Sequence, residues 1–133
     1  MLLQKLETLT QYLLATTEWR ERFEGTTAFH DTTSTHPATV FFPLEAMAIL
    51  YFHDLKEPVA SYTAQLRSYY RWSLQHLRDT DMQPPGLPPQ PLIARLRVSD
   101  EHGLNHQMET LLRMHSSLAK AIGLQADRLL DRT

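Results

Sequence analysis

Apolar residues recur at helical spacing along most of this chain, and the clearest stripe lies near its C-terminal end. Its members, spaced three, four or seven residues apart, are Leu104, Met108, Leu111, His115, Leu118, Ile122 and Leu129. This spacing places them on one face of an α-helix. A helix with one apolar face must bury that face against other elements, so the chain is expected to form a helical bundle.

Three further helices are predicted upstream of this stripe. The leucines at the start of the chain predict a helix over 2–24 that ends at Gly25. Pro43 suits the first turn of a helix, and the residues that follow it are apolar on nearly every side, which predicts a short helix buried at the centre of the fold. The next helix is expected over 58–79, beginning at Pro58.

A helix N-terminus is predicted at Ser99, Asp100 and Glu101 from their polar and acidic character. One short helix is predicted before it, over 92–98. A Thr- and His-rich stretch, 25–42, is expected to be a long loop with a brief extended part at 38–42, and the Pro-rich stretch 79–91 a stiff crossover.

The predicted fold is therefore all-α. Residues 1–133 form a single-domain bundle of about four main helices and one short helix, with a long Thr-rich loop and a Pro-rich crossover. The residues expected in its core are Leu6, Leu9, Leu13, Met47, Leu50, Leu66, Tyr70, Leu104, Leu111, Leu118 and Ile122.

The composition narrows the classes of partner and compartment. A formal net charge of −2 argues against a dedicated nucleic-acid binder, which usually has a basic excess. The most apolar run, 46–52, is too short to span a bilayer, and the first residues show no secretory signal. The chain has no cysteine, which excludes disulfides and thiolate metal sites and is compatible with a reducing compartment. A cytoplasmic protein without membrane contact is expected.

The helix over 58–79 carries the strongest indication of a binding surface. Arg67 and Arg71 lie opposite its apolar face, while Tyr69 and Trp72 lie on the flank. Trp, Tyr and Arg are the residues most often found as hot spots of protein interfaces. These four residues are therefore expected to bind a partner protein or a second copy of the chain. The alternative is that the long Thr-rich loop covers Tyr69 and Trp72.

No motif in the sequence is specific enough to assign an enzymatic reaction. All four glycines are isolated, so Gly-rich phosphate loops and nucleophile elbows are absent. The leading interpretation is a small interaction protein without a cofactor, such as an adaptor, a chaperone-like subunit, an antitoxin or an immunity factor.

One short motif supports an alternative, enzymatic interpretation. Arg71 and His76 have the R-x4-H spacing that resembles the catalytic motif of HEPN-type ribonucleases, which are also small helical bundles. The resemblance covers six residues. It implies metal-independent RNA cleavage, with Arg71 steadying phosphate charge and His76 taking part in proton transfer. Trp72 departs from the family, which usually has a polar residue at that position, and the competing interpretation is an ordinary surface arginine and a boundary histidine.

Histidines support a second alternative, a metal or ligand site in the bundle. His102 and His106 are one helical turn apart, but both point away from the apolar stripe, so solvated side chains are expected. His115 lies within the stripe, and an interior pair would form if His53 lay opposite it. No tight metal is predicted.

Overall fold

Four long helices, each antiparallel to its neighbours, build the molecule. The computed structural model describes residues 1–27, 37–79 and 90–131, and the helices within these ranges are α1 (Leu2–Gly25), α3 (Ala38–Tyr51), α4 (Lys56–Asp79) and α5 (Leu92–Asp131). One short 3₁₀ helix, η1 (His53–Leu55), joins α3 to α4. The part of the chain so described contains no strand, and the predicted all-α bundle is confirmed.

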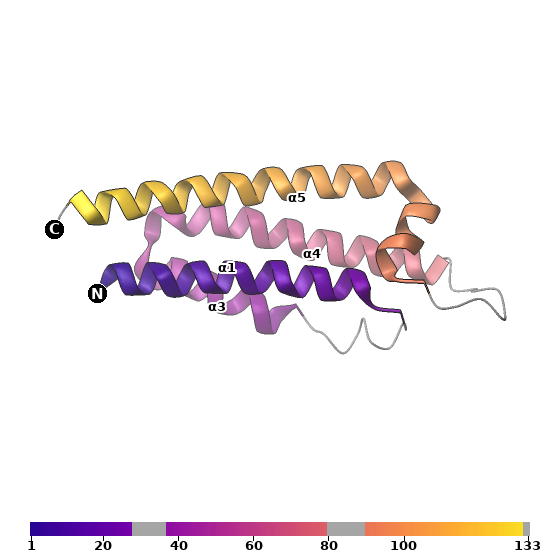
Figure 1. Cartoon of the computed structure of the whole chain (residues 1–133), viewed down its shortest axis with the longest axis horizontal. Coiled ribbons are helices and arrows are strands. Elements are labelled where there is room, and N and C mark those ends of the chain that lie inside the picture. Colours follow the sequence, from indigo (N-terminus) through magenta and orange to yellow (C-terminus); the bar gives the residue numbers. More distant parts are fainter. Residues whose placement is uncertain (28–36, 80–89, 132–133) are drawn as a thin grey trace.

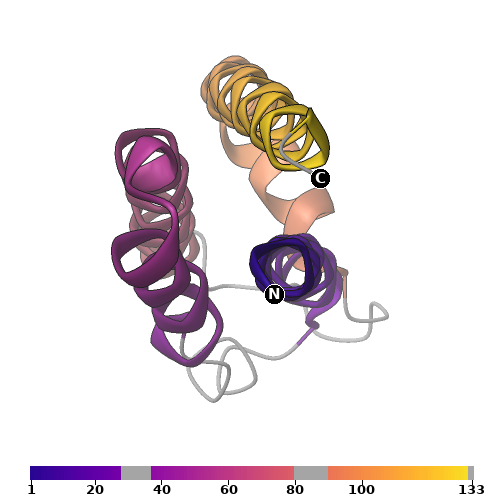
Figure 2. The same ribbon diagram turned by 90° about the vertical axis from the view of Figure 1, so that its left-hand side faces the viewer.

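The helices stand at the four corners of a bundle (Figure 2). α1 packs beside α3 and α5, and α4 packs beside the same two helices from the opposite corner. Each helix runs opposite to the previous one, so the start of α1 and the end of α5 lie at the same end of the bundle (Figure 1). None of the helices in the described ranges combines the length and the apolar character needed to cross a bilayer.

Most residues predicted for the core are confirmed there. Leu6, Leu9, Leu13, Leu66, Leu104, Leu111 and Leu118 are buried. Met47, Tyr70 and Ile122 are half-buried and pack against this cluster. The prediction that Leu50 lies in the core is wrong, because 70% of its surface is exposed.

The structure corrects the prediction for α3 in both its start and its place. The helix begins at Ala38, so the extended segment expected at 38–42 and the helix start expected at Pro43 are wrong. Pro37 initiates the helix instead, with its carbonyl accepting hydrogen bonds from the amides of Val40 and Phe41 at 3.0 Å each. α3 lies at a corner of the bundle and not at its centre (Figure 2). Residues 28–36 of the predicted Thr-rich loop and residues 80–89 of the Pro-rich crossover lie outside the described residues.

α5 consists of two helices that meet at Asp100. The backbone of Asp100 is non-helical (φ −158°, ψ 79°), and its Oδ1 accepts a hydrogen bond from the amide of Gly103 at 2.9 Å. This is the geometry of an N-cap, so the helix start predicted here is confirmed. The first part of α5 is tied to the end of α1 by a 2.8 Å bond from the Leu92 amide to the Thr26 carbonyl.

Candidate interaction surface

Aromatic rings from three helices pack together in the bundle interior. Trp19 of α1 stacks on Phe23 and meets Phe41 of α3 edge-on, each at a centroid distance of 5.3 Å. Phe23 meets Tyr69 of α4 edge-on at 6.2 Å. Tyr69 has no exposed surface, so its predicted place on an exposed flank is wrong. The residues that cover it belong to α1, which a helical wheel of α4 alone does not include.

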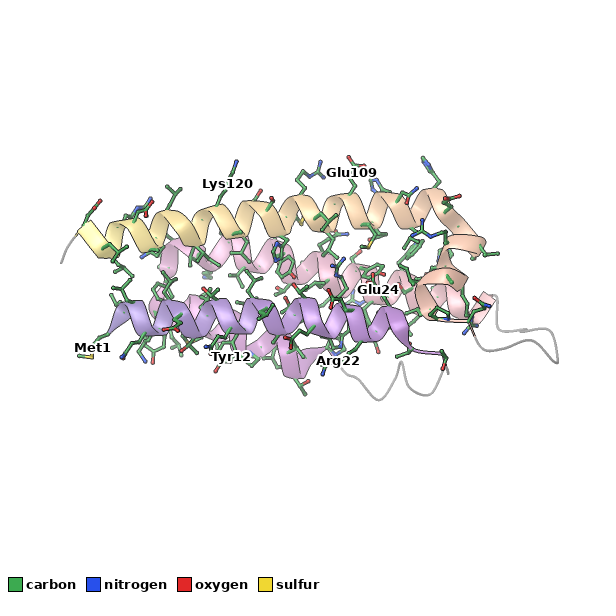
Figure 3. All side chains as sticks on the ribbon, in the orientation of Figure 1. Met1, Tyr12, Arg22, Glu24, Glu109 and Lys120 are labelled. Atoms are coloured by element: carbon green, nitrogen blue, oxygen red, sulfur yellow. The ribbon has the colours of Figure 1, made fainter. Side chains whose placement is uncertain are left out.

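The hydroxyl of Tyr69 is also occupied within the bundle. It donates a 2.7 Å hydrogen bond to Oε2 of Glu24. Burial, and then the neighbouring Glu24 carboxylate, raise the pKa of Tyr69 far above its usual value, because both disfavour the phenolate. Figure 3 shows Glu24 on the inner side of α1, whereas Glu109 and Lys120 point outward from α5. Tyr69 therefore connects two helices and is not available to a partner.

Trp72 is half-buried where α4 passes the kink of α5. Its ring is nearly parallel to that of Tyr69 at 6.4 Å and lies 4.3 Å from the ring of His76. A Cβ added at Gly103 would lie 3.0 Å from Cζ2 of Trp72, so the indole lies close to the α5 backbone. Much of the area that Trp72 was expected to offer a partner is used inside the chain.

The structure does not bring Arg71 and His76 together. His76 faces α5, with Nδ1 3.0 Å from the Trp72 carbonyl and Nε2 3.5 Å from Oδ2 of Asp100. Arg71 is exposed and lines a hollow next to α3. The two side chains lie on opposite sides of α4, so one chain does not assemble the pair that the ribonuclease resemblance implies.

Arg67 and Arg71 border the outer side of α3. Arg67 forms an ion pair with Glu45, and its guanidinium carbon lies 5.4 Å from the ring centroid of Phe41 and 5.9 Å from that of Phe42. A shallow hollow of about 230 Å³ is lined by Pro37, Ala38, Phe42, Arg67, Tyr70 and Arg71. The two arginines predicted to bind a partner thus lie beside an exposed apolar helix.

The outer side of α3, here called the α3 surface, is formed by Phe42, Ala46, Ile49 and Leu50. Their spacing places them on one helix face. The exposed fractions are 59% for Phe42, 58% for Ile49 and 70% for Leu50, and Ala46 is also exposed. Sequence reasoning missed this surface because the opposite face of α3 is apolar as well. The sequence therefore carried no polar contrast to show which face is outside.

The inner face of α3 fixes the α3 surface in place. Phe41, Leu44 and Ala48 are buried, and α3 packs on both α1 and α4 through this face. The outward residues are therefore held by a packed helix and not by a loop. A preorganised surface binds with less loss of conformational entropy than a mobile one.

The histidines do not converge. His102 and His106 are exposed on α5, as expected from the helical wheel. His53 is exposed in η1, so it does not form the interior pair considered with His115. Within the described ranges, no three histidine, aspartate or glutamate side chains lie close enough together to hold a metal ion.

His115 is half-buried between α4 and α5. Its ring meets the ring of Tyr62 edge-on at a centroid distance of 5.5 Å. Burial, and then the positive charge of Arg20, lower the pKa of His115 below its usual value. The residue is thus a neutral packing element near neutral pH.

Comparison of the chain with protein-family models, with curated proteins and with solved structures finds no match. A functional assignment therefore rests on the residues of this chain. The α3 surface gathers three large exposed apolar side chains on one helix face. Apolar side chains gathered on one patch mark contact sites, whereas single exposed ones are common everywhere.

Proposed function

We propose that this protein is a protein–protein interaction module that binds through the α3 surface. The observation that carries the proposal is the exposure of Phe42, Ile49 and Leu50 on one face of a well-packed helix. Removing the exposed part of these three side chains from water favours association, at about 25 cal/mol for each Å² of apolar surface covered. The proposal keeps the predicted function and moves the predicted surface from α4 to α3.

Arg67 and Arg71 belong to the rim of this surface. They adjoin Phe42 and supply planar hydrogen-bond donors beside an apolar centre. An apolar centre with a polar rim is the usual anatomy of a protein interface. Adaptors, chaperone-like subunits, antitoxins and immunity factors, the classes expected from the sequence, all act by binding another protein. A cytoplasmic location is part of this proposal and is supported by the lack of cysteine.

Site-specific photo-crosslinking in the source cell tests the proposal. A photoreactive phenylalanine derivative in place of Leu50 should give a defined crosslinked complex. The same derivative in place of Leu124 of α5, whose exposed fraction of 58% is similar, should not. The crosslinked protein, whether another protein or a second copy, is then purified, and its binding is measured with and without Leu50→Glu.

A loss of affinity of about tenfold or more in Leu50→Glu supports the α3 surface as the binding site. Equal affinity of Leu50→Glu and the unsubstituted protein overturns the proposal. So does crosslinking from position 124 and not from position 50.

A further inference from the structure

His102 and His106 lie one helical turn apart on the outer side of α5. Both side chains are exposed, and the helix that carries them is continuous from Glu101 onward. Residues four apart on a helix have Cβ atoms about 5–6 Å apart, so the two imidazoles can reach the same point outside the helix. Two histidines at this spacing on one helix face are able to bind the same zinc ion.

We propose that His102 and His106 together bind one divalent transition-metal ion of the kind that imidazole suits, such as Zn²⁺, Ni²⁺ or Cu²⁺. This is a surface site built by one helix, whereas the interior site considered from the sequence needs ligands from several helices. α5 occupies the corner of the bundle diagonal to α3 (Figure 2). The site is therefore separate from the α3 surface, and the inference does not depend on the proposed function.

The backbone that carries the two histidines is anchored on its inner side. Asp100 caps the first turn through the 2.9 Å bond from the Gly103 amide. Gly103 lies against Trp72, and Leu104 is buried. Helix ends usually fray, which would separate ligands one turn apart. The cap and the buried residues hold this turn in place, so only side-chain rotations remain to be fixed when an ion binds.

Carboxylates around the pair favour a cation. Glu109 shares the same helix face three residues beyond His106, and it points outward from α5 (Figure 3). Asp100 and Glu101 add negative charge at the helix start, which offsets the positive end of the helix dipole. Arg113 is also on this face, but it is seven residues beyond His106 and therefore opposes the cation less than Glu109 attracts it.

Two protein ligands set a moderate affinity. Zinc sites with four ligands have dissociation constants of about 10⁻⁷–10⁻¹² M, and a pair supplies about half of that binding free energy. The expected dissociation constant is on the order of 10–100 μM. Within residues 1–27, 37–79 and 90–131, no third histidine, aspartate or glutamate completes the site. Water would therefore fill the remaining positions on the ion.

Isothermal titration of the full chain, without a histidine tag, with zinc chloride measures this site. One equivalent should bind with the affinity given above. His102→Gln and His106→Gln should each weaken binding about tenfold or more, because a single imidazole cannot chelate the ion. His53→Gln is the matched control, since His53 is also exposed but lies in η1, and it should leave the affinity unchanged. Circular dichroism confirms that all variants are helical.

Urea denaturation reports whether the ion spans a folded helical turn. The unfolded chain does not keep the two imidazoles one turn apart, so an ion that needs this spacing stabilises the folded chain. Zinc at about ten times the dissociation constant should raise the urea midpoint of the unsubstituted protein and of His53→Gln. The shift should be lost in His102→Gln and His106→Gln.

Four outcomes overturn the inference. They are no binding up to about 1 mM zinc, binding that is unchanged in both His102→Gln and His106→Gln, a ratio of one ion to two chains, and a urea midpoint that zinc does not raise. None of these results bears on the α3 surface, which photo-crosslinking tests separately.

Discussion

The Tyr69 hydroxyl and the Glu24 carboxylate are 2.7 Å apart, and their hydrogen bond joins α4 to α1 across the diagonal of the bundle. The donor ring is completely buried and the acceptor is half-buried. Hydrogen bonds to charged groups contribute more than neutral ones, because the charged form gains most from an aligned donor.

Tyr69→Phe is expected to lower the free energy of unfolding by about 1–2 kcal/mol, since it removes this donor and leaves the ring packing unchanged. Urea denaturation followed by circular dichroism measures the change. Tyr12→Phe is the control, because Tyr12 is half-exposed and points away from α5 (Figure 3). An equal loss of unfolding free energy in the two variants would show that the hydrogen bond to Glu24 does not stabilise the fold.

His115 is expected to make the fold sensitive to acid. Its pKa is lowered in the folded state by burial and by Arg20, whereas in the unfolded chain it is about 6.5. Below that pH the unfolded chain binds more protons than the folded one, so the free energy of unfolding falls as the pH drops from about 6.5 toward the lower folded pKa.

Urea midpoints at about pH 7.5 and about pH 5 measure this loss. His115→Gln should reduce the difference between the two midpoints, because it removes the titrating group. His106→Gln should not reduce it, since His106 is exposed on the same helix. An identical pH dependence in all three proteins would assign the acid sensitivity to other groups.

The kink of α5 requires a residue without a side chain at position 103. A Cβ on Gly103 would lie 2.3 Å from Oδ2 of Asp100 and 3.0 Å from Trp72. Gly103→Ala is therefore expected to destabilise the fold by about 1–3 kcal/mol, because the cap or the indole must move.

Gly123 offers a matched control on the same helix. A Cβ there would meet nothing within 4 Å. Gly123→Ala should stabilise by about 0.5–1 kcal/mol through the better helix propensity of alanine. Thermal unfolding of both variants measures whether each substitution stabilises or destabilises the fold. A stabilising Gly103→Ala would contradict the packing described at the kink.

The local features of the fold could be predicted from the sequence. Asp100 begins the second part of α5 because an N-cap depends only on its own side chain and the next few amides. Leu104, Leu111 and Leu118 are buried because a helix with a polar opposite face has only one side to bury. Such features can be predicted without knowing how the helices pack against one another.

The candidate site could not be predicted from the sequence, because it depends on how several helices pack together. Tyr69 is buried by Phe23, which lies 46 residues earlier in the chain, so a wheel of α4 could not show it. The outward face of α3 was equally hidden, because Leu50 and Leu44 differ little as residues and only the positions of α1 and α4 decide which is covered.

The first turn of α1 and the last turn of α5 lie at the same end of the bundle. The last helix is therefore a neighbour of the first, just as each other helix is a neighbour of the next one in the chain. Each helix is antiparallel to both of its neighbours, including α5 and α1 (Figures 1 and 2). A flexible linker from Asp131 to Leu2 would close the chain, and new ends could be opened between α4 and α5. A circularly permuted chain that starts at α5 is expected to build the same bundle, with the outward face of α3 unaltered.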